Sequence, residues 1–137
     1  MSPNFVWRDA GRTVVFRDSG LRDAPQLLAE HGFEPFDLLS SERHLAAAGE
    51  LAAAARSIRE VPTAAVPDAA AALLEGGGSD SLVALGGGRI VDSAKAIASV
   101  TGARVAAIPT TMSGAEMTGI HRLPAGSASR VRAMIRP

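Results

Sequence analysis

Apolar and β-branched runs alternate along this chain with alanine-rich stretches in which apolar residues recur at helical spacing. Short apolar runs are typical of buried strands, and stretches of helical spacing are typical of helices that pack on a sheet. Strands that alternate with helices form repeated βα units and build a mainly parallel sheet. The pattern therefore predicts an α/β fold with a Rossmann-like, mainly parallel sheet, helices on both faces and an N-terminal hairpin.

Glycines and prolines divide this pattern into short elements. Gly32, Gly76 and Gly102 stand where helices are expected to end, and Pro67 stands where one is expected to begin. The expected strands are Phe5–Trp7 and Thr13–Phe16, paired around a turn at Asp9–Arg12, and then Phe36–Leu39, Ser57–Val61, Leu82–Leu85 and Val105–Ile108. The expected helices are Leu21–His31, a helix from Ser40 or Ser41 to about Ala55, Pro67–Glu75 and Ile90–Val100. Met117–Arg122 and Arg130–Ile135 are expected to be extended and antiparallel.

The length and charge of the chain narrow the class of protein. Its 137 residues match one ordinary domain, residues 1–137, that is large enough to bury an apolar core. With 14 basic and 14 acidic residues the formal net charge is zero, which argues against nucleic acid or an anionic membrane as partner and favours a small neutral or anionic ligand. Cysteine is absent, so disulfides and thiolate metal sites are excluded. Neither a leader segment nor an apolar run of the ~20 residues that span a membrane is evident, so we expect a cytoplasmic protein.

Two glycine runs look alike in composition but differ in their place in the pattern. EGGGSD at 75–80 follows an expected helix and precedes an expected strand, a position typical of a helix end and loop. GGGRIVD at 86–92 follows the strand Leu82–Leu85 and opens the helix Ile90–Val100. A glycine turn in this context lets the backbone approach a phosphate group, while the next helix directs its amides at that group. The second run is therefore predicted to bind phosphate, although it lacks both the G-x-G-x-x-G spacing and a P-loop.

The second glycine run belongs to the segment GGGRIVDSAK, which is followed further along by AAIPTTMSGAEMT. This pair of motifs resembles the iron-containing alcohol dehydrogenase family, which is related to dehydroquinate synthase and carries GGGSxxDxAK and then IPTT with a segment that ends in SE-x-T. The short form PTTMSGAEMT is most similar to the maleylacetate reductase branch. The segment TVVFRDSGL also fits the family, so the resemblance covers essentially the whole chain.

The resemblance implies a nicotinamide cofactor, NAD or NADP, and assigns residues to it. The cofactor pyrophosphate would rest on Gly87, Gly88 and the amide of Arg89. The residues that would contact phosphate or ribose further along the cleft are Thr110, Thr111 and Ser113. Asp92, in the first turn of the next helix, either interacts with the helix dipole or makes a polar contact with cofactor or substrate.

Several residues depart from the family pattern. Where an acidic residue normally binds the adenosine ribose, Ser40 is expected to donate a hydrogen bond, and Arg43 would favour a 2′-phosphate, which leaves NADP open. Arg89 stands in place of the usual serine, beside the expected pyrophosphate. Arg17 and Ser19 stand in place of two glycines, so the first turn is less permissive.

Other polar residues near the motifs have structural interpretations. Asp92 and Lys95 lie on one helix face, which favours a salt bridge over a direct ligand role for Lys95. Glu116 is expected to satisfy loop amides rather than to act as a general base. The histidines lack the spacing of a metal site. We expect His31 at a helix end, His44 at the surface and His121 in a structural or solvent-facing position.

In the family that the chain resembles, a helical domain supplies metal ligands and much of the substrate pocket, so a metal ion, Fe or Zn, is expected only with such a domain. We therefore expect this chain to be the cofactor domain of an NAD(P)-dependent oxidoreductase. When a helical domain completes the enzyme, it would transfer hydride to a small carbonyl or maleylacetate-like substrate. The isolated chain is expected to be inactive. The alternatives are an enzyme assembled with a separate helical domain and a non-catalytic nucleotide-binding or protein-interaction module. An apolar face left uncovered would favour a homo-oligomer.

Overall fold

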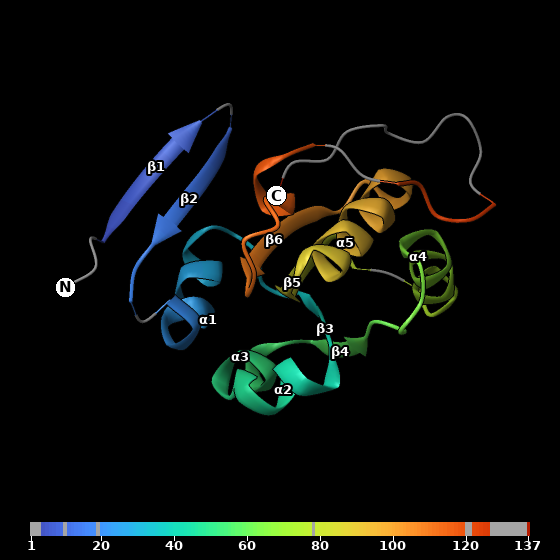
Figure 1. Cartoon of the computed structure of the whole chain (residues 1–137). Helices are drawn as coiled ribbons and strands as arrows, with labels where there is room; N and C mark the ends of the chain where they lie inside the picture. Colours follow the sequence, from blue (N-terminus) through green and yellow to red (C-terminus); the bar gives the residue numbers. More distant parts are fainter. Residues whose placement is uncertain (1–3, 10, 19, 78, 120–121, 127–136) are drawn as a thin grey trace.

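A four-stranded parallel sheet forms the centre of the molecule, and a two-stranded antiparallel hairpin lies beside it (Figure 1). The computed structural model describes residues 4–9, 11–18, 20–77, 79–119, 122–126 and 137. The hairpin consists of β1 (Phe5–Asp9) and β2 (Arg12–Phe16). The parallel sheet has the order β4-β3-β5-β6, and its strands are β3 (Asp37–Ser40), β4 (Ser57–Glu60), β5 (Ser81–Gly86) and β6 (Arg104–Pro109). The predicted parallel sheet and N-terminal hairpin are thus confirmed.

Helices cover both faces of the parallel sheet, as the sequence predicts. One face packs against α1 (Gly20–Glu30), α2 (Glu42–Ala48) and α3 (Glu50–Ala54), and the other against α4 (Val66–Glu75) and α5 (Gly88–Thr101). Side chains of a strand point alternately to the two faces. In β5, Val83 and Leu85 therefore join the core under α1–α3, whereas Leu82 and Ala84 join the core under α4 and α5. Burial on both faces explains why β5 is apolar almost throughout.

The direction in which the chain proceeds across the sheet reverses between β3 and β5, which is the switch point of the sheet. From β3 the chain proceeds to β4 on one side, and from β5 it proceeds to β6 on the other side. The connections on the two sides run over opposite faces of the sheet. In open α/β sheets, ligands bind outside the carboxyl ends of the strands at such a switch point. The switch point therefore lies beside β5, after which the sequence predicts the phosphate-binding turn.

The helix expected between Ser41 and Ala55 is divided into α2 and α3, which corrects the single helix of the sequence prediction. Ser41 is the N-cap of α2, and its hydroxyl accepts a hydrogen bond from the His44 amide. Gly49 separates the two helices at φ +53° and ψ −119°, a conformation outside the helical region. The alanines on both sides favour helix by propensity alone, so the periodicity of the sequence gives no sign of this break.

The final described segment also differs from expectation. Met117 ends a short 3-10 helix, η1 (Ala115–Met117), and the described residues of 117–122 contain no strand. The expected strand Arg130–Ile135 lies outside the described residues. No helix in the described ranges is both long and apolar enough to cross a membrane.

Candidate functional site

A glycine turn connects the end of β5 to the start of α5. Gly86 has φ +156°, and a Cβ at this position would lie 2.5 Å from Cδ1 of Ile90, so the turn requires glycine here. Gly87 is the N-cap of α5 and has no side chain to cap the helix, while its carbonyl accepts hydrogen bonds from the amides of Ile90 and Val91. The helix thus begins at Gly88, earlier than the predicted Ile90. An uncapped helix start presents amide donors at the positive end of the helix dipole.

The segment after β6 packs directly over this turn. The Thr110 amide donates a hydrogen bond to the Gly86 carbonyl at 3.0 Å. A Cβ on Gly87 would lie 3.3 Å from Cγ2 of Thr111, and a Cβ on Gly88 would lie 2.9 Å from Oγ of Ser113. The glycines therefore allow two polar side chains to approach the backbone closely. The structure brings together five of the residues that the sequence predicts for the site, namely Gly87, Gly88, Thr110, Thr111 and Ser113.

A buried lysine holds the far end of this segment. Lys95 of α5 is completely buried, and its Nζ donates to the carbonyl of Ala115 at 2.8 Å and to the carbonyl of Thr118 at 3.2 Å. The same Nζ lies 3.1 Å from Oδ1 of Asp92, so the predicted salt bridge is confirmed. Asp92 is about one third exposed. Lys95 thus fixes η1 against α5 next to the glycine turn, which sequence spacing alone does not reveal.

Two predicted site residues use their side chains elsewhere. Ser40 is completely buried, and its hydroxyl donates to the Leu85 carbonyl at 2.6 Å. The hydroxyl is enclosed within the sheet, which corrects the expectation that it reaches a ribose. The Arg89 guanidinium donates to the carbonyl of Pro62, in the loop between β4 and α4. Only the backbone amide of Arg89 belongs to the helix start.

The sequence predicts His44 at the surface, whereas the structure half-buries it between two hydroxyls at the carboxyl edge of the sheet. Nδ1 of His44 lies 2.6 Å from Oγ of Ser41, and Nε2 lies 3.0 Å from Oγ1 of Thr110. The ring therefore links the start of α2 to the end of β6. The available signal was a histidine in the first turn after a buried strand, three residues after a capping serine, because this turn lies at the carboxyl edge of the sheet.

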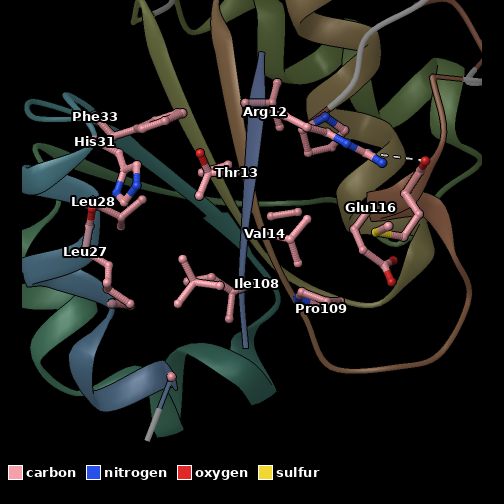
Figure 2. A pocket seen from close by; sticks show the side chains of 18 of the residues that line it. Arg12, Thr13, Val14, Leu27, Leu28, His31, Phe33, Ile108, Pro109 and Glu116 are labelled. Atoms are coloured by element: carbon pink, nitrogen blue, oxygen red, sulfur yellow. Dashed lines mark hydrogen bonds between the residues drawn. The ribbon is translucent and has the colours of Figure 1, made fainter. Parts of the chain in front are cut away.

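An open groove of about 1430 Å³ lies between the hairpin, α1, β6 and the segment after β6. Figure 2 shows Leu27 and Leu28 of α1 on one side of β2 and Glu116 on the other. Oε2 of Glu116 is buried and accepts no hydrogen bond from the described residues. This oxygen does not satisfy a loop amide, contrary to expectation, and it can accept a hydrogen bond from a hydroxyl or amide of a ligand.

A metal site is not formed by the residues that the structure describes. No group of three or more His, Cys, Asp or Glu side chains among them is arranged to hold a metal ion. A metal centre needs such a set of donors. The described residues therefore do not fit a metal, and we derive no chemistry through one.

A parallel sheet wound on both faces, with a glycine turn at its switch point, defines a Rossmann-like α/β protein. A family model described as iron-containing alcohol dehydrogenase matches residues 15–120, and the chain belongs to this family.

Relatives within the family include maleylacetate reductases. Maleylacetate reductase 2 of Cupriavidus pinatubonensis is 45% identical over 74 residues, which are 54% of this chain and 20% of that protein. The crystal structure of maleylacetate reductase from Agrobacterium tumefaciens matches with a TM-score of 0.70 and 26% identity over 100% of this chain and 40% of that one. The enzyme from Rhizobium sp. strain MTP-10005 matches with a TM-score of 0.72 and 25% identity over 99% of this chain and 42% of its own. The chain thus spans about two fifths of these solved relatives.

Proposed function

We propose that this chain is the NAD(P)-binding domain of an oxidoreductase. Within the complete enzyme, hydride would pass between the nicotinamide ring and a small carbonyl compound or a maleylacetate-like acid. Membership of the iron-containing alcohol dehydrogenase family and the likeness to maleylacetate reductases support this proposal. Because the chain spans about two fifths of the solved relatives, a further helical domain would complete the substrate site.

The observation that carries the proposal is the glycine turn opposite the hydroxyl-bearing segment at the switch point. The absence of a Cβ at Gly86 and Gly87 lets the side chains of Ile90 and Thr111 pack against the turn, and the uncapped start of α5 provides amides from Gly88 and Arg89. These features fit a pyrophosphate group. The exposed hydroxyls that would contact phosphate or ribose belong to Thr110, Thr111 and Ser113.

The residues of this chain bind and orient rather than perform chemistry. The cofactor supplies the hydride when it is bound. Lys95 keeps η1 against α5, and Asp92 neutralises the buried ammonium group instead of repelling the phosphates. Glu116 presents a carboxylate oxygen that suits a ribose hydroxyl or an amide and would repel a phosphate. Hydride transfer also needs a substrate held in reactive geometry, so we expect this chain alone to bind cofactor without turnover.

Calorimetric titration of the 137-residue chain with NADH, NADPH and ADP-ribose tests the proposal. Gly87→Ala places a methyl group between the turn and Thr111 at a position whose φ of −81° allows alanine. We expect this variant to bind at least about tenfold more weakly, because one lost phosphate contact is worth about 1.4 kcal/mol. A preference for NADPH that is lost in Arg43→Ala would show that Arg43 selects the 2′-phosphate.

The matched control is Gly76→Ala in the other glycine run. Its φ is −79°, and the added methyl group would lie 2.9 Å from the Arg59 guanidinium and 3.5 Å from the Leu73 carbonyl oxygen, at the opposite end of β5 from the glycine turn. This variant should bind like the unmodified chain. Absence of binding at millimolar ligand in a well-folded sample would contradict the proposal.

The alternative function is a non-catalytic nucleotide-binding or protein-interaction module derived from the same fold. The observation in its favour is that two departures from the family motif serve structural contacts. Arg17 lies 3.3 Å from Asp23 of α1 in an ion pair, and Arg89 contacts the loop after β4. A folded chain that fails to bind any of the three ligands would favour the protein-interaction form of this alternative.

A further inference from the structure

A hydrogen-bonded chain of three side chains crosses the carboxyl edge of the sheet. It begins at Ser41, which follows β3, continues through the His44 ring and ends at Thr110, which follows β6. In the sheet order, β5 lies between β3 and β6. This hydrogen-bonded row of side chains must therefore pass the end of β5, where the glycine turn begins.

The two ends of this hydrogen-bonded row, Ser41 and Thr110, are held differently. Ser41 is fixed as the N-cap of α2 because its hydroxyl accepts the His44 amide hydrogen. Thr110 is fixed through its backbone, since its amide donates to the Gly86 carbonyl. The Thr110 side chain is exposed, so sterics leave its hydroxyl free to turn. The His44 ring supplies the contact that orients it.

Either neutral tautomer of the ring preserves this arrangement. If Ser41 donates to Nδ1, then Nε2 carries the proton and donates to Thr110; in the other tautomer both bonds reverse. One hydrogen bond on each side holds the plane of the ring in both cases. Both tautomers therefore hold the Thr110 oxygen in place, and the Nε2–H tautomer leaves the Thr110 proton free to donate to a phosphate oxygen, which only accepts hydrogen bonds.

We propose that His44 is a positioning residue of the nucleotide site, which orients the Thr110 hydroxyl toward the phosphate group bound at the glycine turn. This inference rests on the proposed function, because it assigns a residue to the same nucleotide site. A purely structural role would predict that loss of the ring, whose Ser41 contact is part-buried and whose Thr110 contact is exposed, lowers stability without affecting ligand binding. Positioning instead predicts that removal of the ring weakens ligand binding while the melting temperature changes little.

Two substitutions separate positioning from support of the helix start. His44→Asn carries an amide about as far as Nδ1, so it can still bond Ser41 but cannot reach Thr110. His44→Gln extends the amide about as far as Nε2 and can bond Thr110. We expect His44→Asn to raise the Kd for ADP-ribose and for the preferred cofactor about tenfold, and His44→Gln to stay within about threefold of the unmodified chain. Calorimetry gives the Kd, and thermal unfolding gives the stability.

A double-mutant cycle shows whether His44 acts through Thr110. In a Thr110→Val background the hydroxyl is absent, so His44→Asn should cause no further loss of binding. The inference is overturned if His44→Asn binds normally, if Gln does not restore binding, or if the effect of Asn persists in the Thr110→Val background. An unmodified chain that binds none of the ligands overturns the proposed function together with this inference, whereas a binding chain with an insensitive His44 overturns only the inference.

Discussion

At the scale of single residues, Lys95 connects the segment after β6 to helix α5 in the core. It is the only lysine in the sequence and it is completely buried, although lysine is almost never found fully buried unless it is paired. Its ammonium group forms an ion pair with Asp92 in the same helix and donates hydrogen bonds to two carbonyls of the segment after β6. The residue therefore stabilises a segment twenty positions away along the chain.

Replacement of this lysine should destabilise the protein. In Lys95→Met the buried carbonyl of Ala115 loses its donor, and Asp92 loses its partner but remains partly hydrated. We expect a loss of about 2–4 kcal/mol in the free energy of unfolding, measured by urea titration followed by circular dichroism. The control is Arg22→Met, which removes a cation whose side chain is 77% exposed and should cost less than about 0.5 kcal/mol. Equal effects of the two variants would contradict the role assigned to Lys95.

At the scale of elements, glycines with positive φ decide where helices end. Gly49 separates α2 from α3 at φ +53° and ψ −119°, whereas Gly102 ends α5 in the left-handed region at φ +78° and ψ +8°. Neither position has a heavy atom within 4 Å of the place where a Cβ would stand. Any cost of substitution therefore comes from backbone conformation rather than from a clash.

This difference in backbone conformation gives a paired prediction for thermal unfolding. Gly49→Ala should cost about 1–3 kcal/mol, because its conformation is almost restricted to glycine. Gly102→Asn should cost less than about 1 kcal/mol, since asparagine tolerates the left-handed region at a helix end. If Gly49→Ala instead raises the melting temperature, the two helices can join, and the packing of α2 and α3 does not require the break.

At the scale of the whole molecule, the hairpin carries apolar side chains that are about half exposed, and Phe5, Trp7 and Phe16 line the open groove between the hairpin, α1 and β6. Phe5, Val6, Trp7 and Phe16 are each between 45% and 55% exposed. Strand alternation and register place Phe5, Trp7 and Phe16 on one face of the hairpin, and the rings of Phe5 and Phe16 stack with their centroids 5.2 Å apart, so these three side chains form a contiguous exposed area. Contiguous apolar surface of this kind favours association.

We therefore expect the chain to self-associate and to bind a hydrophobic dye. Light scattering coupled to size-exclusion chromatography should show a mass above that of the monomer. Replacement of Phe5 and Phe16 by serine should shift the population toward monomer, whereas Val100→Ser on α5, where the side chain is 45% exposed, should not. A monomer without dye binding would contradict this expectation.

Local pattern was sufficient for much of the fold. The alternation of apolar runs and alanine-rich stretches determined the order of strands and helices, because burial on a sheet imposes these periodicities on neighbouring residues. The glycine turn after β5 and the polar residues after β6 were also predictable, since their position at the carboxyl ends of parallel strands brings them to the same edge. Ser41 and Gly102 were recognisable as helix limits from their chemistry.

Only the tertiary structure decided how side chains from distant segments meet. The Ser40 hydroxyl is enclosed where it contacts Leu85, its neighbour in the sheet, which is 45 positions away in the sequence. His44 likewise contacts Thr110, which is 66 positions away. The break at Gly49 depends on a backbone conformation that no local propensity demands. The sequence alone determined the elements and the edge of the sheet at which they place the site, because those depend on local periodicity and chain order. Long-range packing decides which hydroxyls are exposed at this edge of the sheet, so only the folded chain shows them.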